Sequence, residues 1–188
     1  MSDLLAEIAH VQREAELLHS AQAVQGAIRR LAGRITGTLK DSNPLVLCVM
    51  NGGLVPTGWL LPMLSFPLQL DYIHATRYRG EIRGRDLEWR VRPSMPVKAR
   101  TILLIDDIFD QGVTLTHIVD DCCKQGALQV FTAVLVRKQR TSNGLQPDFI
   151  GLDAPDRYLF GCGLDYKNYL RNLPAIYAMP DDLHSTGD

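Results

Sequence analysis

Hydrophobic and polar positions follow two different periods along this chain, which predicts a mixture of helices and strands. From residue 3 to residue 40, apolar side chains recur at helical spacing in two stripes. The first stripe contains Leu4, Leu5, Ile8, Val11, Ala15 and Leu18, and the second contains Val24, Ile28, Leu31 and Ile35. We therefore expect two amphipathic helices at the start of the chain.

Continuous apolar runs predict strands that are buried on both faces. Such runs occupy residues 45–50, 101–105 and 130–136. Residues 68–74 look like another strand, and shorter candidates occupy 149–150, 158–160 and 175–177. Helices are expected at 55–64, where Pro62 kinks or ends the helix, and from Leu115 to Cys122. This alternation predicts a single α/β domain with a mostly parallel central sheet flanked by helices. The N-terminal helices and residues of about 150–180 lie outside the alternation, so we expect them to form a small hood lobe over the carboxyl edge of the sheet.

Composition excludes several classes of protein. The 188 residues, 46% of them apolar, are enough for one domain with a sizeable core. A net charge of −1 provides no basic field for nucleic acid, and no apolar stretch has the length of a membrane span or a signal peptide. The four cysteines form no C-x-x-C pair, so we expect packing residues and a cytoplasmic protein. The five histidines show no ligand spacing and are assigned no chemistry.

The richest candidate for chemistry follows the strand at 101–105. Asp106 and Asp107 come where we expect this strand to leave the sheet, and Asp110-Gln111-Gly112-Val113-Thr114 forms a polar turn before the next helix. Ligands of open parallel sheets bind outside the carboxyl ends of strands, and a helix start presents free N–H groups to anions. Carboxylates beside an anion site suit a ligand that carries both hydroxyl groups and a phosphate.

This run resembles the 5-phosphoribosyl 1-diphosphate (PRPP) loop of the type I phosphoribosyltransferases. The resemblance implies that the two acids hold the ribose hydroxyl groups and a Mg²⁺ ion, that the turn holds the 5′-phosphate, and that Asp110 is the catalytic group at N7 of the base. The implied PRPP-binding residues are Asp106, Asp107, Asp110, Gln111, Gly112, Val113 and Thr114. Gln111 and Val113 depart from the residues common in the family, but backbone amides supply most of the phosphate contacts.

A second loop, Asn51-Gly52-Gly53, also lies between a strand and a helix. Glycine allows close approach of the backbone to a ligand, so this turn can surround a pyrophosphate. It resembles the pyrophosphate loop of hypoxanthine-guanine phosphoribosyltransferases, in which the first position is usually basic; here it is Asn51. The resemblance also implies a cis peptide bond between Met50 and Asn51.

The segment 147–173 resembles the same branch of the family. The resemblance implies that Lys138 donates to the exocyclic oxygen of a 6-oxopurine, that Tyr158 stacks on the ring and that the Leu159 backbone reads the base edge. Because Arg137-Lys138 stands where the family has Asp-Lys, either residue can hold the first role, and we favour Lys138. Asp165 takes the place of a carboxylate associated with the metal. Arg171 takes the place of a pyrophosphate-binding arginine.

An arginine-rich segment at about 75–92 stands where the family has its flexible lid, with Arg77-Tyr78 in place of the usual Ser-Tyr. The resemblance thus implies a purine-salvage enzyme that transfers the phosphoribosyl group from PRPP to N9 of hypoxanthine or guanine. Its substrates are small molecules, its cofactor is Mg²⁺, and we expect a homodimer or homotetramer without nucleic-acid or membrane partners. The alternatives are a PRPP-responsive regulator of the same fold that binds nucleic acid, and a phosphoribosyltransferase for another base such as xanthine.

Overall fold

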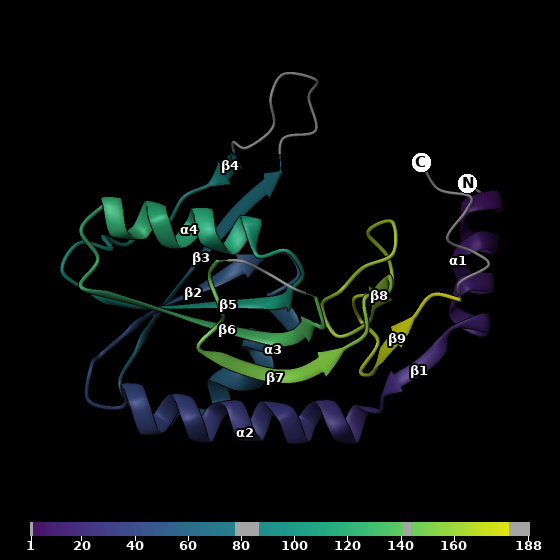
Figure 1. Ribbon diagram of the computed structural model, residues 1–188, viewed down its shortest axis with the longest axis horizontal. Helices are drawn as coiled ribbons and strands as arrows, with labels where there is room; N and C mark the ends of the chain where they lie inside the picture. The colour runs from purple at the N-terminus through teal and green to yellow at the C-terminus, as the bar shows by residue number, and fades with distance from the viewer. Residues whose placement is uncertain (1, 78–86, 141–143, 181–188) are drawn as a thin grey trace.

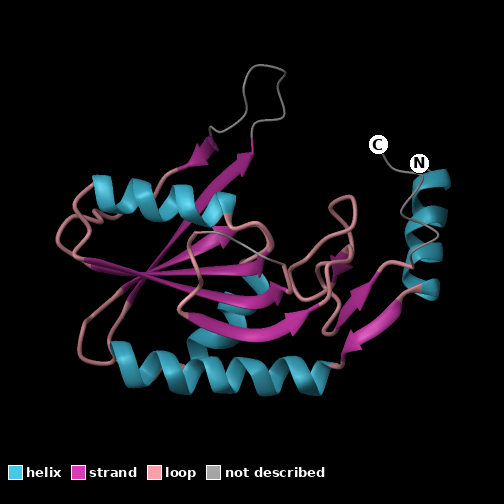
Figure 2. Ribbon diagram, viewed as in Figure 1, coloured by secondary structure: helices cyan, strands magenta, loops and turns pink. Residues whose placement is uncertain are grey.

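The computed structural model describes residues 2–77, 87–140 and 144–180. Its centre is a six-stranded sheet with the strand order β4-β3-β2-β5-β6-β7, seen as magenta arrows in Figure 2. The strands are β2 (Leu45–Met50), β3 (Gln69–Arg77), β4 (Leu87–Val91), β5 (Thr101–Phe109), β6 (Gln129–Lys138) and β7 (Phe149–Ala154). All neighbouring pairs are parallel except β3 and β4, which form an antiparallel ribbon at one edge. The predicted mostly parallel α/β sheet is confirmed.

Helices cover both faces of this sheet (Figure 1). One face packs against α2 (Ala21–Leu39) and α3 (Leu54–Leu60), and α3 continues into the short helix η1 (Leu61–Met63), which contains Pro62. The other face packs against α4 (Val113–Lys124), whose Leu115, Ile118 and Cys122 are buried. Neighbouring strand residues contribute to opposite faces, so Leu103 contacts the α2 side and Leu104 the α4 side. None of the helices in these described ranges is long and apolar enough to cross a membrane.

A smaller sheet lies beyond the carboxyl ends of the main strands (Figure 1). Its order is β1-β9-β8, with β1 at Glu16–His19, β8 at Leu159–Phe160 and β9 at Ile176–Ala178. The helix α1 (Ser2–Glu14) packs against it through Ile8 and Val11, which join Phe160 and Met179 in a separate cluster. The small lobe expected over this edge is therefore present, although its membership differs from the expectation.

Three expectations about the elements were wrong. Residues 16–19 form strand β1 instead of extending the first helix, because they pair with β9. The second N-terminal helix belongs to the main sheet, since its buried stripe packs into the main core and α2 contacts β7. Strand β7 also joins the main sheet, where it pairs with β6, so the small lobe begins after residue 154.

Candidate active site

The site lies where the pairing between β2 and β5 ends at the carboxyl edge of the sheet. The ladder between these strands stops at Cys48 and Ile105, whereas β5 continues beside β6 as far as Phe109 and Arg137. From β2 the chain proceeds to β3 on one side, and β5 and β6 build the sheet on the other. Such a reversal of strand order opens a crevice in which α/β proteins bind ligands.

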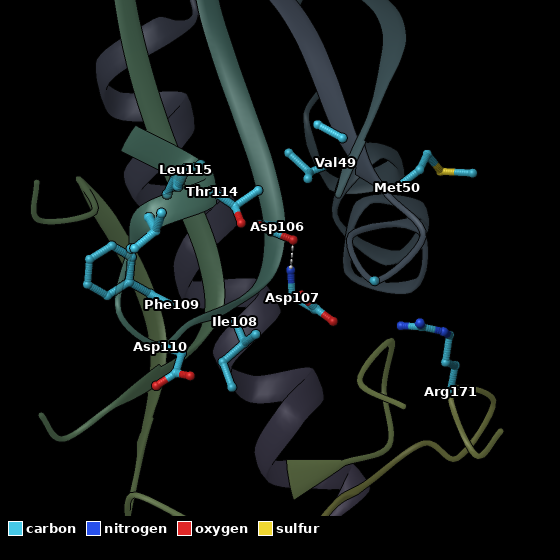
Figure 3. Close-up of a pocket in the computed structure, with 14 residues that line it drawn as sticks. Val49, Met50, Asp106, Asp107, Ile108, Phe109, Asp110, Thr114, Leu115 and Arg171 are labelled. Atoms are coloured by element: carbon cyan, nitrogen blue, oxygen red, sulfur yellow. Dashed lines mark hydrogen bonds between the residues drawn. The ribbon is translucent and has the colours of Figure 1, made fainter. Parts of the chain in front are cut away.

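Asp106 and Asp107 lie in this crevice, inside strand β5 and not after its end as the sequence had indicated. The backbone N–H of Asp107 donates to Asp106 Oδ1 at 2.9 Å, the dashed line in Figure 3. Burial, followed by repulsion from Asp107, raises the pKa of Asp106 well above its usual range. Burial also raises the pKa of Asp107, although the nearby charge of Arg171 partly opposes this rise. Because burial disfavours the charged forms of these two carboxylates, a bound cation or hydroxyl group would stabilise them.

The turn after β2 packs directly over Asp107, and this contact requires a glycine. A Cβ atom at Gly52 would stand 2.0 Å from Asp107 Oδ2. The peptide bond between Met50 and Asn51, which opens this turn, is cis, as the resemblance implied. The turn therefore brings backbone close to the carboxylates of β5 without a side chain between them.

The polar turn after β5 runs into α4, whose first two residues are Val113 and Thr114. Gly112 caps this helix in the left-handed conformation with φ of 73°, and a Cβ atom there would meet the ring of Phe109 at 2.5 Å. Within the part of the chain that the structure describes, no side chain caps the helix. The first N–H groups of α4 are thus available to an anion such as a phosphate.

These elements enclose a pocket of about 360 Å³. Figure 3 shows Asp106, Asp107, Asp110 and Thr114 on one side and Arg171 on the other. Arg171 is held by two hydrogen-bonding contacts, from Nη1 to the Gly163 carbonyl at 2.6 Å and from Nη2 to Asp165 Oδ1 at 2.7 Å. The second carboxylate oxygen of Asp165 accepts the backbone N–H of Asn168 at 2.7 Å. Asp165 thus positions Arg171.

A network of charged side chains adjoins the pocket beyond Asp110. Asp110 Oδ1 lies 3.0 Å from Arg140 Nη1 and 3.8 Å from Lys138 Nζ. Both cations also pair with Asp156, and hydrogen bonding from Arg140 lowers the pKa of that carboxyl group. Lys138 is 13% exposed, so its ammonium group lies in a partly enclosed position.

Arg140 and Asp156 were assigned no role from the sequence. Residues two apart in an extended segment point the same way, so the position of Arg140 two residues after Lys138 was a signal that could have identified it. The neighbouring Arg137 points elsewhere and donates from Nε to Asp153 at 2.7 Å. The structure therefore brings Lys138, and not Arg137, to Asp110.

Tyr158 directly precedes β8 and is 40% exposed. Its ring forms a T-shaped pair with the ring of Tyr166, at a centroid distance of 5.8 Å and an interplanar angle of 82°. The hydroxyl of Tyr166 donates to Glu7 on α1 at 2.5 Å, and burial raises the pKa of Tyr166 to about 12. Leu159 is buried in β8. The small lobe thus sets the orientation of Tyr158, a role of Tyr166 that the sequence did not reveal.

The remaining predicted residues occupy different surroundings. Asn51, Gln111 and Val113 are exposed, and Gly53 is buried against the backbone of Val49 and Ile105. Arg77 is the last residue of β3, where it pairs with Leu87. Tyr78 lies outside the described residues. Of the predicted lid at about 75–92, the structure therefore describes only the end of β3 and the residues from β4 onward.

Asp106→Asn is expected to raise the melting temperature at neutral pH. A carboxyl group with a raised folded-state pKa lowers stability as pH rises above the unfolded value of about 3.9, because the folded state resists losing the proton. Removing that charge should add on the order of 1–3 kcal/mol to the free energy of unfolding at pH 7. Thermal unfolding from pH 4 to pH 8 measures this gain, which should grow with pH. An equal gain at all pH values would contradict the assignment to charge burial.

The fold and the site together define an α/β protein that binds a phosphorylated, hydroxyl-bearing ligand at the switch point of its sheet. A family model described as the phosphoribosyl transferase domain matches residues 14–166. The chain belongs to this family and is a phosphoribosyltransferase.

Individual relatives agree with this assignment. The chain is 28% identical to the hypoxanthine-guanine-xanthine phosphoribosyltransferase of Tritrichomonas foetus, over 90% of this chain and 93% of that protein. It is 29% identical to the hypoxanthine-guanine phosphoribosyltransferase of Bacillus subtilis (strain 168), over 86% of this chain and 91% of the relative. A crystal structure of a hypoxanthine phosphoribosyltransferase from Staphylococcus aureus has the same fold, with a TM-score of 0.86 and 20% identity, over 93% of this chain and 96% of that one.

Proposed function

We propose that this protein transfers the 5-phosphoribosyl group of PRPP to N9 of hypoxanthine or guanine, giving IMP or GMP and pyrophosphate. The observation that supports this most strongly is the position of Asp110. Asp110 is the first residue of the phosphate-binding turn, and its carboxylate lies 3.8 Å from the ammonium group of Lys138. One residue thus adjoins both the group that would hold the ribose phosphate and the group that would select the base.

PRPP would occupy the pocket between β2, β5 and α4. The N–H groups at the start of α4, together with Gln111, Gly112, Val113 and the Thr114 hydroxyl, would hold the 5′-phosphate. Asp106 and Asp107 would accept hydrogen bonds from the ribose hydroxyl groups. The pyrophosphate would lie beside Asn51, Gly52 and Gly53 on one side and Arg171 on the other.

The donor set also suits Mg²⁺. Carboxylate oxygens are the ligands that this ion prefers, and it usually takes only one or two from a protein, with the rest from water and substrate phosphates. The described residues contain no cluster of three acidic, histidine or cysteine side chains able to hold a metal by themselves, so an ion carried by PRPP fits better. Asp106 and Asp107 would hold it, with Asp165 nearby. When bound, it would offset negative charge on the departing pyrophosphate.

The reaction exchanges one bond at the anomeric carbon for another. The bond from N9 forms, the bond to the pyrophosphate oxygen breaks, and the proton on N7 is drawn to Asp110. Lys138 would donate to O6 of the base, and Tyr158 would stack on the ring. The Leu159 backbone would contact the base edge. Arg77 and Tyr78 would belong to the lid over the reacting groups.

The alternatives make different demands. A phosphoribosyltransferase for another base such as xanthine would use the same PRPP pocket and differ only beside Lys138 and Tyr158. A PRPP-responsive regulator that binds nucleic acid would need a basic face, and the net charge of −1 gives no support for one.

An ultraviolet assay with PRPP, Mg²⁺ and each purine in turn tests the proposal. Hypoxanthine and guanine should be converted to nucleotides, and adenine should not. Xanthine as the best substrate would select the phosphoribosyltransferase for another base. Binding of PRPP without conversion of any purine would select the regulator.

Lys138→Ala should weaken the use of 6-oxopurines and narrow the gap to adenine. The physical reason is that adenine presents an amino donor where the ammonium group needs an acceptor, which costs about 1–3 kcal/mol. The measurement is kcat/KM for hypoxanthine, guanine and adenine. Arg137→Ala is the matched control, because Arg137 pairs with Asp153 instead of facing Asp110. If only the Arg137 variant loses selectivity, then Arg137, and not Lys138, is the residue that donates to O6 of the base.

We further infer that the protein acts as a homodimer or homotetramer in the cytoplasm. Large apolar side chains that are about half exposed support self-association; they include Leu54 at 54%, Leu70 at 46% and Tyr72 at 46%. All four cysteines are free thiols, as expected for a reducing compartment. Light scattering on the purified protein distinguishes the two assemblies from a monomer.

A further inference from the structure

A second cavity, of about 550 Å³, opens on the pyrophosphate side of the site. It is lined by Met50, Asn51, His74, Thr76, Glu88, Arg90, Asn168 and Arg171. Met50 and Arg171 also line the PRPP pocket, so the two cavities adjoin. The second cavity thus extends the site from the turn after β2 toward the edge of the sheet.

The wall of this cavity is the antiparallel ribbon of β3 and β4. His74 and Thr76 of β3 and Glu88 and Arg90 of β4 line the cavity, and a register shift in the ladder falls at Arg90, between the pairs His74–Val91 and Ala75–Trp89. Thr76 stands directly opposite Glu88 in the ladder. The ribbon therefore presents one polar face to the turn that begins at Asn51.

The charges on this face are distributed unevenly. Arg171 is already paired with Asp165 at 2.7 Å. Arg90, by contrast, has no carboxylate within 4.0 Å among the residues placed by the structure, although Glu88 lines the same cavity. Its neighbour Arg92 points away and pairs with Asp121 on α4 at 2.8 Å. Among the described residues, Arg90 is therefore the cation of this cavity that forms no ion pair with an acidic side chain.

The turn itself lacks a cation. The residue that precedes Gly52 is the neutral Asn51. A diphosphate beside the turn would meet no positive side chain from it, and the backbone N–H groups of Gly53 and Leu54 already donate to the carbonyls of Val49 and Asn51. Arg90 lines the same cavity as Asn51 and belongs to β4, which is separated from β2 by β3.

We propose that Arg90 binds the pyrophosphate group, both of PRPP and of the released product, and supplies from β4 the positive charge that Asn51 does not. This inference rests on the proposed transfer reaction, and it assigns to that reaction a binding residue on the β3–β4 ribbon. A guanidinium group can donate two parallel hydrogen bonds to one phosphate, which a single ammonium group cannot.

The first test measures Mg²⁺-pyrophosphate binding to the intact protein by isothermal titration calorimetry. Arg90→Gln should raise the dissociation constant about tenfold, the usual size for a hydrogen bond to a charged group. It should raise the KM for pyrophosphate in the reverse reaction by a similar factor and leave the KM for IMP unchanged. Low ionic strength is needed, because the side chain is exposed and salt screens its charge.

Three further variants separate a binding role from a structural one. Arg92→Gln removes the same charge from the same part of the chain and should leave pyrophosphate affinity unchanged. Arg90→Lys should keep part of the affinity, because the charge remains. Asn51→Lys in the Arg90→Gln background should restore binding, since it returns a cation to the same cavity from the turn. A structural defect in β4 would not be repaired in this way.

The results distinguish the inference from the function on which it rests. Wild-type affinity for pyrophosphate in the Arg90→Gln variant, with an active wild-type enzyme, overturns the inference alone. An equal loss in the Arg92→Gln variant also overturns it, because the effect would then be one of overall charge. A wild-type protein that binds neither PRPP nor pyrophosphate contradicts the proposed function itself.

Discussion

Asp110→Asn is expected to lower kcat by about 10²–10⁴-fold, the usual contribution of acid–base catalysis, while PRPP binding is largely kept. The amide keeps the shape of the side chain and its contact with Arg140, but it cannot take the N7 proton. Steady-state kinetics with hypoxanthine measures the loss. Calorimetry with Mg²⁺-PRPP measures the binding that should remain.

Asp156→Asn provides the matched control for this experiment. Asp156 is the other carboxylate that pairs with both Lys138 and Arg140, so its removal disturbs the same charged network. If Asp110 acts on the base, the Asp156 variant should retain far more activity than the Asp110 variant. Similar losses in the two variants would show that the network, and not proton transfer at Asp110, accounts for the effect.

Asp107→Ala should raise the KM for PRPP by about 10–100-fold, the range expected when a buried charged group loses its hydrogen-bonding partners. Asp107 is 8% exposed, lies under Gly52 and feels the charge of Arg171, so it contacts the middle of the proposed PRPP site. Affinity for the nucleobase should change much less, because Lys138 and Tyr158 remain. Titration calorimetry with Mg²⁺-PRPP gives the comparison.

Gly52→Ala tests the same contact from the opposite side. The added Cβ atom would stand 2.0 Å from Asp107 Oδ2, so the carboxylate must move. This variant should therefore weaken PRPP binding in the same direction as Asp107→Ala. Unchanged PRPP affinity in both variants would mean that the acidic pair, Asp106 and Asp107, does not bind PRPP.

The sequence by itself determined the main sheet and the loops that form the site. Continuous apolar runs identified β2, β5 and β6, because strands covered on both faces need mostly apolar side chains. Asp110, Gly112 and Thr114 after β5 indicated a phosphate-binding turn, since the start of a helix needs little more than exposed N–H groups to bind an anion. Local chemistry therefore sufficed for the class of protein.

Tertiary structure decided the features that depend on distant partners. Residues 16–19 have helical periodicity, yet they form a strand because β9, far along the chain, offers them a ladder. The order Arg137-Lys138 left two candidates for the base-binding cation. The alternation of strand residues turns one toward Asp110 and the other toward Asp153.

The second cavity also depends on residues that are distant in the sequence. Arg90, Asn51 and Arg171 come from three separate parts of the chain, and no local pattern connects them. They meet because β4 pairs antiparallel with β3, which lies beside β2, while the closing segment folds back over the carboxyl edge. Hydrogen bonding between strands fixes these neighbours, and a one-residue change in register would turn each side chain to the opposite face.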